Sequence, residues 1–253
     1  MNTHRWMSAS LLMGSIVLQA TVCNAEPRIG TTASARPKAD AVSGENTRAL
    51  SAGSEIYANQ TVRTGNRGKA DLVFIDNTNL DVGPSSEVRL DRFNYDPRGS
   101  AGSVVMNASR GAFRFVTGTQ DHKAYQVNTP HGSLGVNGTT VEVTVNPNPR
   151  CTPRAGVRLP AECENECVTK VRLVEGEATY DVAKTGKKAH LTQPNQVACI
   201  SPSGNITYSV SSTSILSFSA GDASPPAPTF IPGTGGGTNP VTPPPIVSGT
   251  TPL

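Results

Sequence analysis

Apolar and polar residues alternate along much of the chain between residues 40 and 210, and helical periodicity is hard to find there. In 86–93, for example, Val88 and Leu90 fall on one side of an extended chain, while Arg89 and Asp91 fall on the other. A period of two between turn residues is typical of β-strands. Strand patterns of this kind, or short apolar runs, occupy 71–76, 86–93, 111–118, 140–145, 170–182 and 196–210.

The spacing of these patterns predicts an all-β fold, a stacked β-roll or β-sandwich of short strands. We expect 170–182 to form two strands bent at Glu175-Gly176, and 196–210 to form two strands around Ser203-Gly204. Aromatic residues make up only 5% of the chain, so the core must depend on Val, Leu, Ile and a few Phe. Each buried aliphatic side chain contributes about 1.5–3 kcal/mol, which is enough for a stable domain without a cofactor.

The N-terminal residues have the pattern of an export signal. Arg5 precedes a short apolar stretch, and Cys23-Asn24-Ala25 has the small-x-small form of a cleavage site, so we predict a signal peptide over 1–25. A lipoprotein with Cys23 as the lipidated residue is the alternative, but the residues before Cys23 lack the usual leucine. The exported chain is then periplasmic or secreted.

The C-terminal residues have the composition of a flexible segment. Residues 223–253 contain nine prolines, five glycines and no charged residue, a composition that does not sustain a helix or a strand ladder. We therefore expect a disordered Pro/Gly-rich tail, a linker or a docking peptide. The predicted organisation is a signal peptide (1–25), an N-terminal lead-in (26–39), an all-β domain (40–210) with an insert (147–167), and a Ser/Pro/Gly/Thr-rich tail (211–253).

The charge balance argues against two classes of partner. Removal of Arg5 with the signal lowers the formal net charge from +3 to +2, and the basic residues lie among acidic ones. This mixed surface is unlike a nucleic-acid-binding stripe. No further stretch is long and apolar enough to predict a transmembrane segment.

A glycine-rich stretch, 129–145, raises the question of a phosphate-binding loop. Such a loop needs a following helix and usually a lysine, whereas here the alternating strand pattern of 140–145 follows. We predict a bend at His131-Gly132, a short strand through Leu134 and Val136, and a tight turn at Asn137-Gly138. The predicted structural turn residues are Gly132, Gly135, Asn137, Gly138 and Thr139.

Four cysteines remain after cleavage of the signal, and an even number in an exported chain points to disulfides. Three pairings are possible, and we favour Cys151–Cys163 with Cys167–Cys199. The alternative is a metal site at Cys163 and Cys167, but these residues are four apart and no histidine is near them. We predict no metal and no cofactor.

No catalytic constellation stands out in the sequence. The pattern G-x-S-x-G is absent, and we interpret His122 and His190 as solvated and His131 as structural. The carboxylates Asp71, Asp76, Asp81, Asp91 and Asp96 are scattered, and we interpret them as a solvated face, with Asp76 in a hairpin turn. A pair of them could serve a glycosidase, which is the enzymatic alternative.

An ordered set of short motifs resembles the FecR-type domain, an all-β extracytoplasmic module named after a regulator of iron-siderophore uptake. The resemblance covers about residues 40–206. Its motifs are Leu50 with Gly53, Thr64-Gly65, the Asp-x-Thr-x-Leu of Asp76 to Leu80, Thr129-Pro130 and Gly138-Thr139.

This sequence departs from the family at two points. Asn137 stands where the family usually has an arginine, so any specific role of that arginine is lost here. Membrane regulators of the family place a sigma-factor-binding segment and a transmembrane helix before this domain, and here the predicted signal takes their place. The chain therefore resembles the stand-alone exported members.

These observations predict a non-catalytic binding or scaffold module of the bacterial envelope, with a protein or a glycan as its partner. The resemblance implies a second possibility, a component of a cell-surface signalling system that senses receptor occupancy. A carbohydrate-active enzyme is the third.

Overall fold

The structure is a computed structural model, and it describes residues 26–96, 102–121, 124–146 and 166–216. The predicted signal peptide, most of the predicted tail (217–253), His122, and the cysteines Cys151 and Cys163 lie outside these residues.

Every regular element of the described residues that is longer than one residue is a β-strand, as the alternating pattern predicted. The strands are β1 (Arg28–Arg36), β2 (Ala39–Ser43), β3 (Asn46–Ala49), β4 (Glu55–Tyr57), β5 (Thr61–Thr64), β6 (Lys69–Phe74), β7 (Asn79–Val82), β8 (Glu87–Asn94), β9 (Ser103–Val116), β10 (Tyr125–Thr129), β11 (Gly132–Val145), β12 (Thr169–Val182), β13 (Lys188–Leu191), β14 (Gln196–Ile200) and β15 (Ile206–Val210).

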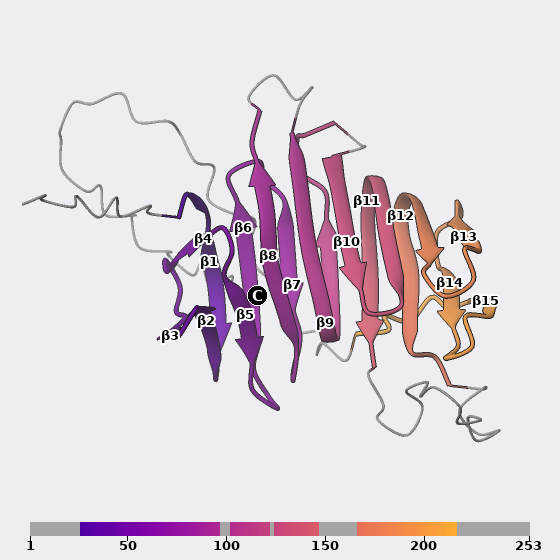
Figure 1. Ribbon diagram of the computed structural model, residues 1–253, viewed down its shortest axis with the longest axis horizontal. Coiled ribbons are helices and arrows are strands. Elements are labelled where there is room, and N and C mark those ends of the chain that lie inside the picture. The colour runs from indigo at the N-terminus through magenta and orange to yellow at the C-terminus, as the bar shows by residue number, and fades with distance from the viewer. Residues whose placement is uncertain (1–25, 97–101, 122–123, 147–165, 217–253) are drawn as a thin grey trace, which may run out of the picture.

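Strand pairing divides this 15-stranded sheet into two layers. Layer one has the order β4-β1-β6-β7, then the second halves of β9 and β11, the first half of β12, and β14-β15. Layer two has the order β3-β2-β5-β8, then the first half of β9, β10, the first half of β11, the second half of β12, and β13. In Figure 1, β3 and β4 lie at one end of the molecule, and β13 and β15 at the other.

Three long strands therefore belong to both layers. Each of β9, β11 and β12 is 14 residues long, and each has a glycine with positive φ near its middle: Gly111, Gly138 and Gly176. Beyond this glycine the strand exchanges some of its neighbours; the first half of β11 pairs with β10, for example, and its second half with β9. Such bulges bend a strand and increase its twist, which carries the chain from one layer to the other.

The tight turn that we expected at Asn137-Gly138 is one of these bulges. Asn137 pairs with Glu177 and Thr140 with Glu175, so β11 has one residue more than β12 over this interval. A Cβ atom on Gly176 would lie 2.3 Å from the carbonyl oxygen of Gly138, so the two strands cross too closely there for any side chain. The bend expected at Glu175-Gly176 is likewise a bulge within β12, because pairing continues on both sides of it.

The bend that we expected at His131-Gly132 is the hairpin turn between β10 and β11. Thr129 pairs with Gly132, which leaves Pro130 and His131 as its two turn residues. The Thr129 hydroxyl lies 3.3 Å from the His131 amide nitrogen and 2.6 Å from the Tyr180 hydroxyl on β12. A Cβ atom on Gly132 would meet the carbonyl oxygen of Asp181 at 2.1 Å, so close packing against β12 requires glycine here.

The domain extends beyond its predicted limits at both ends. β1 lies in the segment 26–39, expected to be a lead-in, yet it pairs with β4 and β6 inside layer one. At the other end, residues 211–216 belong to the segment expected to be a flexible tail, but they make hydrogen bonds to the outer surface of layer one.

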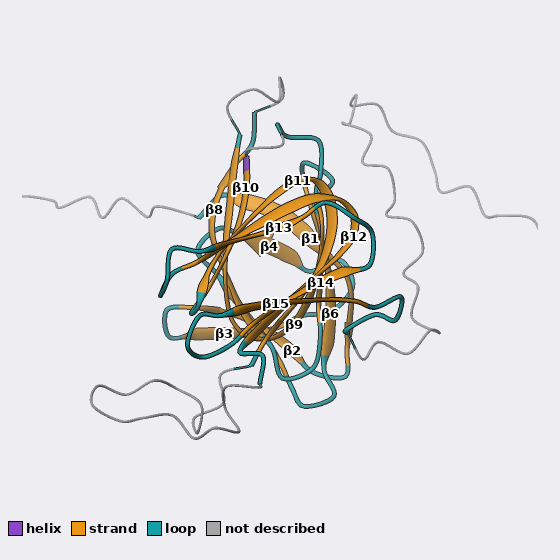
Figure 2. Ribbon diagram, turned by 90° about the vertical axis from the view of Figure 1, so that its right-hand side faces the viewer, coloured by secondary structure: helices purple, strands orange, loops and turns teal. Residues whose placement is uncertain are grey.

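The side chains between the two layers form one apolar core. Viewed along its length, the molecule shows strands running around this core (Figure 2). Fully buried members come from both layers, among them Leu72, Phe115, Leu134, Leu173 and Ile200. In the described residues β3, β4, β13 and β15 each pair on one side only, so the sheet remains open.

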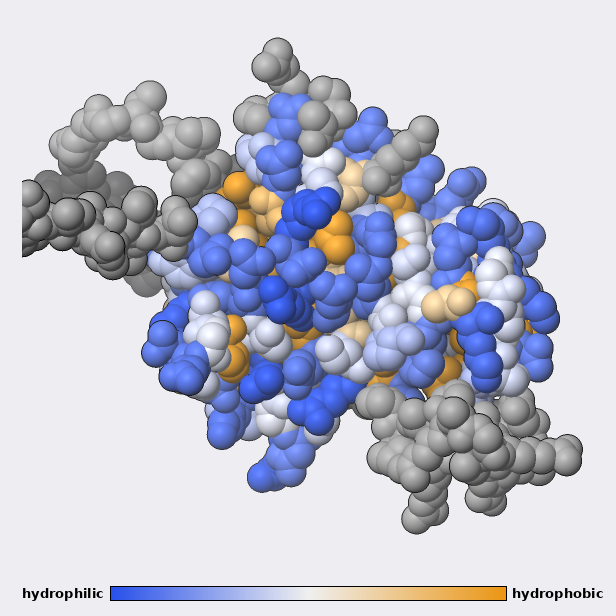
Figure 3. Space-filling model, viewed as in Figure 1, coloured by the Kyte–Doolittle hydropathy of each residue, from blue (hydrophilic) through white to orange (hydrophobic). Residues whose placement is uncertain are grey.

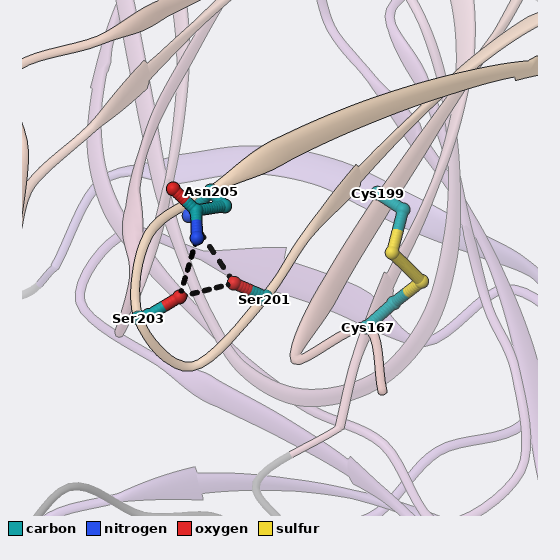
Figure 4. The surroundings of a disulfide bond; sticks show 5 residues. All are labelled: Cys167, Cys199, Ser201, Ser203 and Asn205. Atoms are coloured by element: carbon teal, nitrogen blue, oxygen red, sulfur yellow. Dashed lines mark hydrogen bonds between the residues drawn. A yellow bond between two sulfur atoms is a disulfide. The ribbon is translucent and has the colours of Figure 1, made fainter. Parts of the chain in front are cut away.

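A disulfide joins Cys167, just before β12, to Cys199 in β14 (Figure 4). Its Cα atoms are 5.2 Å apart, within the usual range for a disulfide. This pairing confirms one of the two predicted bridges. Nearby, Ser201, Ser203 and Asn205 make the hydrogen bonds that close the β14–β15 turn expected around Ser203-Gly204.

Candidate functional site

A polar groove of about 370 Å³ lies on the outer face of layer two, over β10, β11 and β12. Its floor is formed partly by Tyr125, Val136 and Ala178, whose side chains are almost entirely buried in the core. The outward-facing residues of the groove are Gln126, Ser133, Gly135, Asn137, Glu177, Thr179 and Asp181.

Strand alternation and register explain why these residues meet. In β11, Leu134 and Val136 point into the core, so Ser133, Gly135 and Asn137 face outward. The register places Ser133 opposite Asp181, Gly135 opposite both Gln126 and Thr179, and Asn137 opposite Glu177. Directly opposed residues of paired strands have side chains within reach of each other. Three strands thus bring their outward polar groups to one surface.

The centre of the groove is low because Gly135 has no side chain. A Cβ atom built there would meet only the carbonyl oxygen of Thr179, at 3.9 Å, so the space above it is open. We expected Gly135 to be a turn residue. It lies instead within β11 with ordinary strand pairing on both sides, and its consequence is a depression in the surface.

Carboxylates and carboxamides dominate the chemistry of the groove. Gln126 Nε2 donates to Asn128 Oδ1 at 2.6 Å, and Asn128 Nδ2 donates to Asn107 Oδ1 at 3.0 Å, which extends the polar surface onto β9. On the opposite side, Asp181 forms an ion pair with Lys188 of β13 at 2.6 Å. Glu177 is exposed. None of the groove's lining residues is basic.

The backbone groups beneath the groove already make hydrogen bonds to neighbouring strands. β10 pairs with β9 and β11, β11 pairs with β10 and β12, and β12 pairs with β11 and β13 at this point. The ladder hydrogen bonds occupy the main-chain groups of these strands. Recognition in the groove must therefore depend on side chains.

The two carboxylates of the groove come from opposite ends of its β12 side. Glu177 and Asp181 are four residues apart on one strand, which separates their α-carbons by about 13 Å. The carboxyl groups of a glycosidase lie roughly 5–9.5 Å apart. His190 lies next to the groove on β13, where its Nδ1 is 3.2 Å from the Thr179 hydroxyl.

Other polar groups that sequence analysis singled out have structural surroundings. Asp76 lies in the β6–β7 turn as expected, but it is fully buried and accepts hydrogen bonds from Thr78 and from the Tyr125 hydroxyl. Burial and the nearby Asp76 raise the pKa of Tyr125 to about 12. The Asp-x-Thr pattern therefore fastens a turn to the core. His131 Nδ1 lies 3.0 Å from the Thr169 hydroxyl, and burial lowers the pKa of this histidine.

The outer face of layer one has a row of charged residues on adjacent strands. In register, Asp71 of β6 lies opposite Asp81 of β7, which lies opposite Arg114 of β9, and the row continues through Glu142 of β11 to Arg172 of β12. Burial, followed by the neighbouring Asp71, raises the pKa of Asp81 to about 6. Asp71 itself is almost fully buried, 3.4 Å from Lys69.

One end of this row is covered. Glu142 and Arg172 form an ion pair at 3.1 Å, with side chains only 1% and 7% exposed. Arg172 also donates to Asn195 Oδ1 at 2.6 Å, and residues 211–216, which we call the strap, supply further partners. Arg172 donates to the carbonyl oxygens of Ser211 and Ser212, while Glu142 accepts from the Ser214 hydroxyl and the Ile215 amide. This pair therefore holds the strap on layer one.

Sequence reasoning did not identify the groove. The outward residues of β11 and β12 follow the period of two, but that pattern does not show which strands become neighbours. We expected the scattered carboxylates to form a solvated face, and this is wrong for Asp71 and Asp76, which are buried. Within the described residues, no group of three or more His, Cys, Asp or Glu side chains is arranged to hold a metal ion. The same residues contain no helix that is long and apolar enough to span a bilayer.

Comparison with known proteins gives a family for the central part of the chain. Residues 60–151 match the family described as FecR protein. Two crystal structures of a proposed anti-sigma factor from Parabacteroides distasonis ATCC 8503 are similar, with TM-scores of 0.44 and 0.43 and 14% sequence identity. The similarity covers 59% of this chain and spans 59% of the length of those chains. The comparison with curated proteins gives no match.

Proposed function

We propose that this chain, whose residues 60–151 match the FecR protein family, is a non-catalytic binding module of the bacterial envelope, periplasmic or secreted, whose ligand occupies the groove on layer two. The observation that carries this proposal is an open polar surface on three strands, β10, β11 and β12, that are each paired on both sides. Glu177, Thr179 and Asp181 project from β12 into a depression that a rigid, fully paired framework holds in place.

Rigidity supports a binding role. Side chains that project from strands are positioned more precisely than those on loops, so less ordering is required when a ligand binds. The groove lies on the layer-two halves of β11 and β12, and the core fixes both strands there through Leu134, Val136 and Ala178. A ligand would meet a surface that is already formed.

Photo-crosslinking in living cells tests this proposal. A photoreactive amino acid replaces Thr179 in the groove, and in a control chain it replaces Thr207 on β15, which is exposed and outside the groove. We expect a crosslinked adduct with an envelope component from position 179 and a much weaker one from position 207. Equal adducts from both positions, or none from position 179, would contradict the proposal.

The FecR match also favours a second function, a part in cell-surface signalling that senses receptor occupancy. This role requires a membrane partner to pass the message inward. Deletion of the gene should then change the transcription of neighbouring receptor or sigma-factor genes. Unchanged transcripts would remove this function and leave the binding role intact.

A further inference from the structure

We propose that the ligand of the groove is a neutral glycan chain, held through its hydroxyl groups by the side chains of β10, β11 and β12. This inference rests on the proposed binding function and names the class of ligand. Its basis is the combination of groups at the groove, namely two carboxylates, two carboxamides, two hydroxyls and an open floor at Gly135.

The hydrogen-bonding capacity of these groups matches a polyhydroxylated chain. A sugar hydroxyl both donates and accepts, and so do the carboxamides of Gln126 and Asn137 and the hydroxyls of Ser133 and Thr179. A carboxylate such as Glu177 accepts from two neighbouring hydroxyls at once, and charge-assisted hydrogen bonds of this kind are the stronger ones.

The charge of the groove decides between neutral and anionic glycans. Its carboxylates are Glu177 and Asp181. Lys188 forms an ion pair with Asp181 at 2.6 Å, and His190 lies beside the groove at 3.2 Å from the Thr179 hydroxyl. A phosphate-rich or uronate-rich polymer would bring further negative charge to this surface. Like-charge repulsion would therefore exclude such polymers, while a neutral chain meets no such barrier.

Two features of the groove argue against a peptide or protein ligand. An extended peptide that adds to a sheet needs an unpaired strand edge, and the three strands here are paired on both sides. A protein hot spot needs a pocket for an apolar or aromatic anchor. The apolar members of the groove, Tyr125, Val136 and Ala178, are at most 4% exposed and offer little surface to such an anchor.

The depression also has a shape that suits a chain of sugar rings. It follows β11 and β12 from Asn137 and Glu177 at one end to Ser133 and Asp181 at the other, a span of about 13 Å. Gly135 lies midway, where the missing side chain lets a ring approach the backbone. A short oligosaccharide would place polar groups over both ends and a ring over the centre.

Titration of the full chain with defined oligosaccharides tests the assignment. The neutral probes are the tetrasaccharides of β-1,4-linked glucose, α-1,4-linked glucose and β-1,4-linked N-acetylglucosamine, and tetragalacturonate is the anionic probe. Binding is measured by isothermal titration calorimetry. We expect at least one neutral probe to bind, and tetragalacturonate to bind at least tenfold more weakly than that probe.

Two variants locate the binding. Gly135→Arg fills the centre of the groove at a position where a side chain has room, and we expect at least a tenfold loss of affinity for the neutral probe. Thr207→Arg makes the same addition on β15, away from the groove, and should leave affinity unchanged. A second groove variant, Glu177→Ala, should weaken binding tenfold even if Gly135→Arg folds poorly.

The outcomes separate this assignment from the proposed function. If no neutral probe binds, or if the groove variants bind it as well as the unmodified chain, the glycan assignment is wrong. A crosslink from position 179 to a protein, with no binding of any neutral probe, would overturn the glycan assignment and retain the binding module. The absence of groove-specific crosslinks together with the absence of probe binding would overturn both.

Discussion

The two outer faces of this domain are built from the same long strands, yet polar side chains are buried on one face and open to solvent on the other. On layer one, Glu142 and Arg172 are buried beneath the strap, and each has its hydrogen bonds satisfied. On layer two, Glu177 and Asp181 lie in an open groove. The covered face holds the chain together, and the open face is available to a ligand. A polar residue on a strand therefore acquires its role from what lies above it.

The largest effect should come from breaking the covered pair. Arg172→Met leaves Glu142 buried without its cation, and removal of one partner of such a pair costs about 3–5 kcal/mol. Urea unfolding followed by circular dichroism measures the loss. The double variant Glu142→Leu with Arg172→Met serves as the control and should lose much less, because no unpaired charge remains. If the single variant lost under 1 kcal/mol, the pair would not hold the strap.

The disulfide at the edge of layer one should come next. Replacing Cys167 and Cys199 by alanine frees a loop closed over a sequence separation of 32 residues, so we expect a loss of about 3–4 kcal/mol. The measurement is again urea unfolding. The unmodified chain under reducing conditions is the comparison and should lose at least as much stability, because reduction would also open the predicted Cys151–Cys163 bridge. A stability unchanged by both treatments would contradict the assigned bridge.

A smaller, pH-dependent effect should come from Asp81 in the uncovered part of the layer-one row. Its pKa is raised from 3.8 to about 6 in the folded chain, so its favourable contribution is complete below pH 3.8 and is lost as the pH rises through 6. Asp81→Asn removes this loss. The variant should therefore be more stable than the unmodified chain by about 3 kcal/mol at pH 8, with the difference shrinking toward pH 4.

Thermal unfolding between pH 4 and pH 8 checks this prediction, because the difference between the two chains must follow the pH. A constant difference across the range would show that Asp81 titrates normally. Arg89→Gln is a suitable control, since this exposed residue lies on β8 in the other layer and should change neither the stability nor its pH dependence.

The smallest effect belongs to the open groove. Glu177→Gln changes an exposed carboxylate, and substitutions of this kind usually alter stability by less than 0.5 kcal/mol. The matched change Glu142→Gln on the covered face should cost clearly more, because Arg172 would lose its anion. If the two substitutions lowered the free energy of unfolding equally, the proposed difference between the two faces would be wrong.

The alternation of apolar and polar residues was enough to predict the strand class and several individual strands. Phe113 and Phe115 of β9 face the apolar core, as expected. The strands on either side of Ser203-Gly204 also formed as expected. The bulges at Gly138 and Gly176 were predicted as a turn and a bend, because a glycine with positive φ serves both structures equally well. Only the partner strands, which are distant in sequence, decide whether the chain reverses or continues.

The groove could not be predicted for a related reason. Gln126, Gly135 and Thr179 become neighbours through strand register, which local sequence does not reveal. Neither did the alternation disclose that Glu142 is buried, because the strap that covers it lies 72 residues further along the chain. The Cys167–Cys199 bridge could be favoured in advance because four cysteines in a chain with a predicted export signal allow only three pairings.

The passage of β9, β11 and β12 through both layers also determines how the domain comes apart. Neither layer can unfold while the other stays intact, because β9, β11 and β12 each have one half in each layer. The molecule therefore has no natural line along which to divide into two smaller stable pieces. We therefore expect its melting to be an all-or-none event, with amide protons at both ends of β11 exchanging with solvent only when the whole domain opens.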